Sequence, residues 1–405
     1  MNKPLSNIRV LDLSRILAAP WAAQTLGDLG AEVIKIERPV VGDDSRRFGP
    51  SFLKDEQGRD TTESAFYISA NRNKKSMTID LSCAEGQNIV CRLAAVSDVL
   101  IENYKVGDLK RYGLDYESLR LVNPRLIYCS VTGFGQTGPY APRPGYDAVF
   151  QAMGGLMSVT GMPDSPMKTG PSLADILSGQ FAVSAILTAL FHREMHSGQG
   201  QHIDVSLLDS VIASLSHYAS HYLVSGEVPL RRGTEGNGGM PARLYRCADL
   251  DIMISAGNND QFARLCQVLG CPSAIGDPDF STSLLRGVNR QRLAEVMEPL
   301  IATRNSVELL RALEQATVPA GPVNDLAQVF SDPHVKSRGM EVTAESTISA
   351  TKFVRMVAHP VKYSATPVER YTAPPTLGQH TREVLRDMLG MDNDEIDRLA
   401  AASVI

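Results

Sequence analysis

Short apolar runs alternate with longer segments of helical periodicity through the first half of the chain. The apolar runs predict strands at residues 8–13, 32–36, 77–81, 99–102, 126–131 and 202–205. The periodic segments predict helices at residues 21–29, 85–95, 173–194 and 207–224. Because strands that alternate with helices form parallel sheets covered by helices, the pattern predicts an α/β fold.

The pattern changes after a glycine-rich break at residues 226–240. A smaller α/β unit follows, with helices predicted at residues 261–269, 290–303 and 306–315. Beyond residue 319 the chain becomes irregular, and it ends in two predicted helices at residues 380–389 and 393–402. A length of 405 residues fits two or three folding units.

The composition narrows the class of protein. The 40 basic and 45 acidic residues leave a net charge of −5, so electrostatics gives no reason to expect a nucleic-acid partner. The chain has no run of about 20 apolar residues, and its first residues contain no apolar signal core. We therefore expect a cytoplasmic protein without a membrane partner.

Neither a disulfide scaffold nor a metal site is expected. The six cysteines are too sparse for a disulfide framework. His217 and His221 share one face of a predicted helix, but Tyr218 stands where a zinc-binding HExxH motif has Glu. A dinucleotide site is also excluded, because the glycine motif at residues 133–138 runs into Pro139 instead of a helix N-terminus.

Asp175 is the only charged side chain between Thr169 and Phe191. One interpretation is a capping box, because Ser172 precedes it by three residues at the start of an apolar helix. The other interpretation is a nucleophile, because a poorly solvated carboxylate attacks more readily. The residues alone favour the cap.

Two polar clusters could bind a ligand. The basic cluster Arg72–Lys75 has the composition of a solvated surface, but Lys and Arg also bind phosphates. Asn103 and Tyr104 come directly after a predicted strand, where parallel sheets bind ligands, and Arg111 follows soon after. Together the clusters suggest a ligand that has phosphates and a planar ring.

Several motifs then match one family in order along the chain. The chain resembles the family III CoA-transferases, the formyl-CoA and carnitine CoA-transferase family, and within it the succinyl-CoA:dicarboxylate branch such as glutarate CoA-transferase. The resemblance is carried by RVLDLSRILAAPWAAQTLGDLGAEVIKIERP (9–39), NRNKKSMTIDL (71–81), IENYKVGDLKRYGL (101–114), GFGQTGPYAPRPGYDAVFQAMGGLMSVTG (133–161), PSLADILSG (171–179) and LGQHTREVL (377–385).

The resemblance implies a fold and an assembly. It implies a large Rossmann-like domain that begins with residues 1–200 and is completed by residues 330–405, and a small domain at residues 225–325. It also implies a homodimer in which the two chains are interlocked.

The resemblance implies a reaction as well, and it reverses the preference for a cap at Asp175. This residue matches the family nucleophile, which attacks an acyl-CoA and passes CoA to a small carboxylate through anhydride and thioester intermediates. CoA thioesters are the substrates, and no permanently bound cofactor is expected. Gly238 and Gly239 match a loop that shields the anhydride from water.

The resemblance also implies the residues that contact CoA. They are Ile16, Leu17, Arg38, Lys74, Lys75, Ile79, Asp80, Asn103, Tyr104, Arg111, Arg143, Tyr146 and Asp147. Formyl-CoA transferases have Gln where this chain has Leu17, which argues against formate–oxalate exchange. Formyl-CoA transferases also have Lys where this chain has Pro144. The neighbouring Arg143 replaces the positive charge of that Lys.

For the acceptor, Arg46 is a candidate to bind the distal carboxylate of a dicarboxylate such as glutarate or itaconate. The alternative for Arg46 is a surface ion pair with Asp43 or Asp44, and the sequence does not choose between them. Three alternative functions remain: exchange between acetyl-CoA or formyl-CoA and oxalate, α-methylacyl-CoA racemisation, and CoA binding without catalysis. Racemases use a His base where this chain has Tyr146, and a binding protein would not need Asp175.

Overall fold

The computed structural model describes residues 3–236 and 240–405, which form two compact units. The large unit contains Met1–Met157, Lys168–Val228 and Lys336–Ile405. The small unit contains Ser158–Met167 and Pro229–Val335. The chain therefore leaves the large unit twice and returns to it each time.

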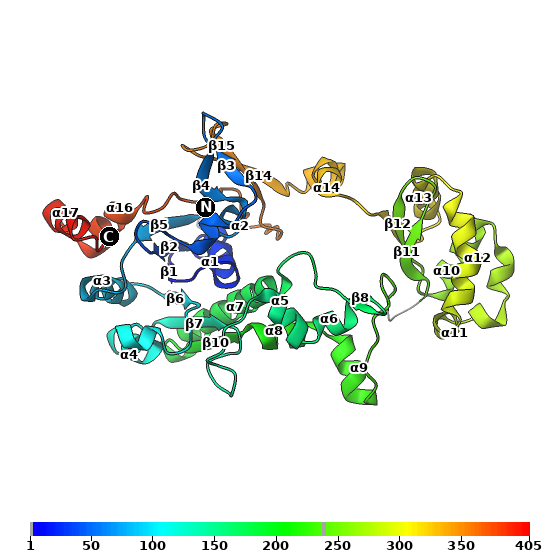
Figure 1. Ribbon diagram of the computed structural model, residues 1–405, viewed down its shortest axis with the longest axis horizontal. Helices are drawn as coiled ribbons and strands as arrows, with labels where there is room; N and C mark the ends of the chain where they lie inside the picture. The colour runs from blue at the N-terminus through cyan, green and yellow to red at the C-terminus, as the bar shows by residue number, and fades with distance from the viewer. Residues whose placement is uncertain (1–2, 237–239) are drawn as a thin grey trace. The chain divides into compact units, whose positions relative to one another are not determined.

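A parallel six-stranded sheet forms the centre of the large unit (Figure 1). The strand order is β10-β7-β6-β1-β2-β5, and all neighbouring pairs are parallel. The strands are β1 (Arg9–Asp12), β2 (Glu32–Glu37), β5 (Lys74–Thr78), β6 (Val99–Glu102), β7 (Ile127–Thr132) and β10 (His202–Ser206). The prediction of an α/β fold with a parallel sheet is confirmed.

Helices cover both faces of this sheet because alternate strand residues point to opposite faces. Val10 lies in one buried cluster and its neighbour Leu11 lies in the other. The Val10 cluster includes residues of α1 (Ala18–Asp28), α5 (Asp147–Met153), α7 (Leu173–His192) and α8 (Leu207–Ser214). The Leu11 cluster includes residues of α3 (Ala84–Ala95), α4 (Tyr116–Val122), α16 (Thr381–Leu389) and α17 (Asn393–Ala401).

Helix α7, with the π-helical turn η3 (Arg193–Ser197) that follows it, is long and apolar enough in composition to cross a membrane. In this structure its buried residues, such as Ala182 and Ile186, pack in the same core cluster as α1 and the sheet. Core helices of globular units commonly have this composition. The first turn of this central helix carries Asp175.

The structure corrects two predicted elements. Strand β5 begins at Lys74, inside the basic cluster, and not at residue 77. The helix predicted at residues 207–224 is two helices, α8 and α9 (His217–Ser225). The break lies at Ser216, whose φ of +50° is incompatible with a continuous helix. Nothing in the local sequence marks this break, because it contains neither Gly nor Pro.

The small unit has its own core around Tyr245, Phe262 and Leu265. Its antiparallel sheet has the order β11-β12-β13. Its elements are β8 (Gly161–Met162), β9 (Ser165–Pro166), β11 (Ala242–Arg246), β12 (Asp251–Ser255), α10 (Asn259–Leu269), α11 (Ser283–Val288), α12 (Arg290–Ala302), α13 (Ser306–Gln315), β13 (Ala320–Pro322) and α14 (Leu326–Ser331).

The C-terminal segment joins the edge of the large sheet. The Ser76 N–H donates to His380 Nδ1 at 3.2 Å, and the Thr78 N–H donates to Thr381 Oγ1 at 3.0 Å. The remaining elements are β3 (Phe52–Lys54), β4 (Asp60–Ser64), α2 (Ala65–Ala70), α6 (Leu156–Val159), α15 (Pro333–Ser337), β14 (Glu341–Glu345) and β15 (Phe353–Val357).

Candidate active site

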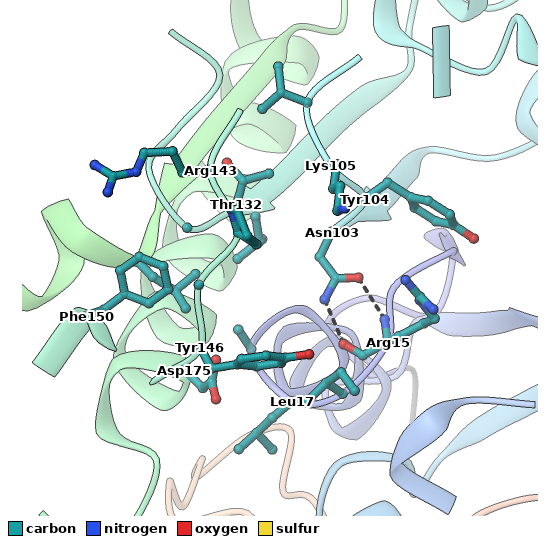
Figure 2. Close-up of a pocket in the computed structure, with 18 of the residues that line it drawn as sticks. Arg15, Leu17, Asn103, Tyr104, Lys105, Thr132, Arg143, Tyr146, Phe150 and Asp175 are labelled. Carbon is teal, nitrogen blue, oxygen red and sulfur yellow. Dashed lines mark hydrogen bonds between the residues drawn. The ribbon is translucent and has the colours of Figure 1, made fainter. Parts of the chain in front are cut away.

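A cavity of about 260 Å³ lies in the large unit beyond the carboxyl ends of β1, β6 and β7 (Figure 2). The ends of parallel strands are where open α/β sheets bind ligands. Its walls come from the segments that follow these strands, from the loop before α5 and from the start of α7. The lining residues include Arg15, Ile16, Leu17, Ala18, Asp44, Asn103, Tyr104, Lys105, Thr132, Arg143, Tyr146 and Asp175.

Asp175 is the acidic side chain at the helical wall of this cavity. It is half-buried and occupies the first turn of α7. Among the residues that the structure describes, none donates a hydrogen bond to its carboxylate, and the Ser172 side chain makes no capping bond. The expected capping box is therefore not formed. Figure 2 shows the carboxylate beside the phenol ring of Tyr146.

Asp147, the first residue of α5, takes over the capping function. Its Oδ1 accepts the Ala174 N–H at 2.8 Å, and its Oδ2 accepts Gln151 Nε2 at 2.7 Å. A neighbouring helix thus satisfies a free N–H of α7 and leaves Asp175 unengaged.

Burial and the charge of Asp147 raise the pKa of Asp175 to about 7. Burial is the larger cause, because removal of water disfavours the charged form. The N-terminus of α7 acts in the opposite direction, since it favours a negative charge. A carboxylate with poor solvation and no hydrogen-bond donor is suited to nucleophilic attack.

A second cavity of about 150 Å³ adjoins the first. Arg15 and Tyr104 line both cavities. The second cavity is also lined by Arg38, Ile79 and Asp80, which follow β2 and β5. Together the cavities extend along the carboxyl edge of the sheet, from Asp175 towards β5.

Positive side chains surround the place where the two cavities meet. Asp44 pairs with Arg15 at 3.1 Å and with Arg38 at 3.0 Å, so this carboxylate lies between two guanidinium groups. The Arg15 guanidinium also lies 5.4 Å from the centre of the Tyr104 ring. An anionic ligand with a planar ring fits such surroundings.

Comparison with known proteins identifies the family. The family model described as CoA-transferase family III matches residues 5–381. The chain belongs to CoA-transferase family III. The family assignment predicted from the sequence motifs is confirmed, and the protein is an enzyme of the CoA-transferase class.

Relatives of this CoA-transferase match along its length. The succinate–glutarate CoA-transferase of Agrobacterium fabrum is 44% identical over 387 residues, which cover 95% of this chain and 96% of that protein. The human succinyl-CoA:glutarate CoA-transferase is 39% identical over 404 residues, which cover 100% of this chain and 90% of that protein. A crystal structure of a CAIB/BAIF family protein from Brucella suis is 41% identical, with a TM-score of 0.85 over 96% of this chain and 100% of that one.

The structure of this family III enzyme brings together many of the residues that the sequence analysis singled out. Ile16, Leu17, Asn103, Tyr104, Arg143, Tyr146 and Asp175 line the first cavity, and Arg38, Ile79, Asp80 and again Tyr104 line the second. Arg111 lines neither cavity. It stacks on Tyr112, which lines the second, at 4.6 Å. The Asp147 carboxylate contacts α7 and Gln151 and also lies outside both cavity walls.

The prediction that Lys74 and Lys75 hold phosphates needs correction. Both residues lie near the amino end of β5 and line a separate cavity of about 460 Å³, whereas the two cavities described above lie at carboxyl strand ends. Lys74 is buried and donates to Asp12, Pro20 and Asn71 at 2.9–3.0 Å. Burial lowers its pKa to about 8.

The alternative interpretation of this basic cluster as a solvated surface is also wrong for Lys74 and for Arg72. The Arg72 guanidinium is buried and pairs with Asp28 at 2.5 Å. Lys75, which is half-buried, pairs with Glu32 and with Glu383 at 2.9 Å. The cluster therefore connects elements within the unit.

The interpretation of Arg46 as a surface residue paired with Asp43 or Asp44 is wrong, and its contact with a substrate stays a prediction that neither cavity supports. Only 2% of this residue is exposed, and it lines neither cavity. Its guanidinium pairs with Glu37 at 2.7 Å and with Glu63 at 3.0 Å, and it also donates to Tyr67 Oη at 2.6 Å. Arg46 is thus buried, and its guanidinium bonds to Glu37, Glu63, Tyr67 and the Pro375 carbonyl oxygen within the large unit.

Gly238 and Gly239 lie outside the residues that the structure describes. Within the described part of the chain, no group of three His, Cys, Asp or Glu side chains could hold a metal ion.

Glu102 supports the second polar cluster, which consists of Asn103 and Tyr104. Its carboxylate accepts the Tyr104 N–H at 2.7 Å.

The polar residues of the first cavity that were not predicted from the sequence include Arg15, Lys105 and Thr132. Each lies at or just beyond the carboxyl end of a strand of the parallel sheet. The signal that identified Asn103 and Tyr104, a polar residue directly after a buried strand, would have found them too.

Proposed function

We propose that this CoA-transferase moves CoA from succinyl-CoA to a dicarboxylate acceptor, and that Asp175 is the nucleophile. The observation that supports this role is the placement of one half-buried carboxylate, without a hydrogen-bond donor, at the wall of a cavity lined by Arg15, Lys105 and Arg143. The substrate proposal is supported by two relatives of known name that act on succinyl-CoA or succinate and on glutarate.

The reaction divides one acyl exchange into four substitutions at carbonyl carbon. The Asp175 carboxylate attacks the thioester of succinyl-CoA, and CoA thiolate leaves, which gives a mixed anhydride. The thiolate then attacks the Asp175 carbonyl carbon, and succinate leaves, which gives an aspartyl-CoA thioester. The acceptor carboxylate attacks this thioester and releases the thiolate. Finally, the thiolate attacks the acceptor carbonyl, which releases the new acyl-CoA and restores Asp175.

CoA would lie along the two adjoining cavities, with its thioester near Asp175. Its phosphates would displace Asp44 from Arg15 or Arg38, because a phosphate is a stronger partner for a guanidinium than an exposed carboxylate. Its adenine would lie by the second cavity, near Ile79 and Tyr104.

The distal carboxylate of a dicarboxylate acceptor requires a cation in the first cavity. Lys105 and Arg143, which form no ion pair within the described chain, are available for this role.

The nucleophile is tested by replacing Asp175 with Ala and with Asn. Both variants should lose CoA exchange, since neither side chain can form an anhydride, and both should remain folded. Asp209→Ala is the matched control, because Asp209 is also the third residue of its helix but is exposed. In wild-type protein, acyl-CoA with hydroxylamine should convert Asp175 to a hydroxamate that peptide mass spectrometry detects. Near-normal exchange by Asp175→Ala would overturn the proposal.

The substrates are tested by incubating the purified protein with succinyl-CoA and single carboxylates, with mass spectrometric detection of new CoA esters. Glutarate and itaconate should form CoA esters faster than pentanoate, which has the length of glutarate but lacks the second charge. Acetyl-CoA with oxalate is the test of the alternative substrate pair. Formation of CoA esters from that pair alone would overturn the dicarboxylate proposal but not the role of Asp175.

We also propose that the active enzyme is an interlocked homodimer. The helices α7, α8 and α9 leave large apolar side chains exposed on the large unit, and a second copy of the chain would cover them. These side chains are Phe181, Phe191, Ile212, Leu223 and Val224.

A further inference from the structure

The segment that follows β1 is held almost entirely by side chains. The N–H and C=O groups of Ser14 and Arg15 and the N–H of Ile16 all bond to side chains of the large unit, one of them the nearby Asp12. The side chains that hold them are those of Asp12, Lys35, Asp43 and Asn103. Since loops normally bond to water or to backbone, this arrangement indicates that the exact path of the segment matters.

Ile16 shows why the segment needs support. Its φ is +73°, in the left-handed region that β-branched residues strongly disfavour. Its N–H donates to Asp43 Oδ1 at 3.1 Å. Backbone strain of this kind persists only where the surroundings enforce it, and it is common at functional sites.

Asp43 is itself fixed by a buried ion pair. Its Oδ2 lies 2.9 Å from Lys35 Nζ, and both side chains are fully buried. Lys35 also donates to the Ser14 carbonyl oxygen at 2.7 Å. The lysine holds the pKa of Asp43 at about 2, so the pair is charged at neutral pH. A buried ion pair is weak evidence for stability, because apolar residues of similar volume often stabilise a protein as well. A positional role explains the pair better.

The supported segment forms one wall of the cavity that contains Asp175. Ile16, Leu17 and Ala18 line that cavity, and Figure 2 shows Leu17 on the same side of it as Asp175. Helix α7 packs directly on the segment: a Cβ added at Gly179 would lie 2.7 Å from the Ala18 carbonyl oxygen. A shift of the segment would therefore change the space in which Asp175 meets the thioester.

We propose that Lys35 and Asp43 are positioning residues of this CoA-transferase, which hold Ile16 in its left-handed conformation and thereby fix the cavity wall beside Asp175. The inference rests on the proposed function, because it assumes that acyl exchange takes place at Asp175. Lys35 lines neither cavity, and Asp43 borders the second cavity but is only 1% exposed, so both residues act through the backbone of Ser14–Ile16.

The test uses two substitutions that change different properties of Asp43. Asp43→Asn keeps the shape and removes the charge that Lys35 holds, whereas Asp43→Glu keeps the charge and moves the oxygen that accepts the Ile16 N–H. Each should lower kcat by about tenfold or more and change KM for acyl-CoA much less, because misplacement affects the reacting geometry more than overall binding. Hydrogen exchange of the peptide containing Ile16 should become faster. Should Asp43→Asn fail to fold, Asp43→Glu provides both measurements.

A double-mutant cycle with Ile16→Gly tests the strained conformation directly. Glycine adopts a positive φ without strain, so the loss in kcat caused by Asp43→Asn or Asp43→Glu should be smaller in the Ile16→Gly background than in the wild-type background. Equal losses in both backgrounds would overturn the proposal.

Asp28→Asn is the matched control. It breaks a buried ion pair with Arg72 in the same unit, and the hydrogen bonds that Asp28 accepts come from Arg72 and Asn73 and not from Ser14–Ile16. It should lower thermal stability but leave kcat and the hydrogen exchange of the Ile16 peptide unchanged. An equal loss of kcat in Asp28→Asn would show that breaking any buried ion pair of the large unit lowers kcat, which would contradict a specific positioning role. Absence of exchange in wild-type protein would instead contradict the proposed function, so the two failures are distinguishable.

Discussion

The proposed nucleophile, Asp175, ionises within the physiological pH range, since burial and Asp147 raise its pKa to about 7. Only the ionised carboxylate can attack a thioester, so kcat/KM should rise with pH up to about 7 and then level off. One pH unit below the pKa, about a tenth of the groups are ionised, so kcat/KM should be roughly tenfold lower at pH 6 than on the plateau.

Asp147→Asn tests the cause of this pH profile. The amide oxygen can still accept the Ala174 N–H, but the negative charge that raises the pKa of Asp175 is gone. The acid limb of kcat/KM should therefore move to lower pH. Asp209→Asn, which removes an exposed charge from a different helix, should leave it in place. The same acid limb in Asp147→Asn and wild type would contradict this account.

Arg46 illustrates how a charged residue that seems suited to a substrate can be structural. Arg46→Met leaves Glu37 and Glu63 buried without their partner, so the free energy of unfolding should fall by about 3–5 kcal/mol, measured by urea denaturation. The ratio of kcat/KM values for glutarate and pentanoate should not change. A selective loss for glutarate would return Arg46 to substrate recognition.

At the scale of elements, the close packing of α7 against the start of α1 determines where Asp175 lies. Gly179 is one turn after Asp175, and a Cβ there would lie 2.7 Å from the Ala18 carbonyl oxygen and 3.1 Å from the Trp21 ring. Because backbone cannot move aside cheaply, Gly179→Ala should separate the helices, lower stability by about 1–3 kcal/mol and reduce kcat. Thermal denaturation and steady-state kinetics measure both effects.

Gly276→Ala provides the control for this prediction. Gly276 lies in the small unit, and the nearest atom to an added Cβ is 4.0 Å away. Its stability should change by no more than about 0.5 kcal/mol, with kcat unaffected. Full activity and stability in Gly179→Ala would show that the two helices do not need this close approach.

Most elements of the large unit follow from local pattern, whereas the partners of its charges do not. Strand β6 and helix α13 occupy the predicted residues because their apolar periodicity is unambiguous. The break at Ser216 has no local signal. The burial of Lys74 depends on Asp12, which lies 62 residues away, and only the parallel sheet brings the two together. Asn103 and Tyr104 line the first cavity, as their position after a strand led us to expect, and their contact with CoA stays a prediction. The same argument applied more widely would have found Arg15.

At the scale of the whole molecule, the exposed apolar side chains of α7, α8 and α9 motivate the dimer. Leu223 is 79% exposed and Val224 is 89% exposed, although both belong to a helix of the large unit. If a second copy covers this surface, Leu223→Glu places a charge at the interface of both chains. Assembly of the dimer from unfolded chains should then be less favourable by at least about 1.4 kcal/mol, seen as a lower midpoint of urea denaturation at equal protein concentration. Light scattering after size exclusion should show dimers for the wild type.

Leu121→Glu is the control for surface charge itself, because Leu121 is 78% exposed on α4 and therefore as accessible as Leu223. Leu121→Glu should leave the mass of the particle unchanged.

An interlocked dimer has a further property, since its chains can separate only by unfolding. Tagged and untagged wild-type dimers should therefore fail to exchange subunits below the unfolding temperature, and that temperature should rise with protein concentration. Rapid exchange between native dimers would contradict interlocking but not dimerisation, whereas a wild-type monomer with full activity would contradict both.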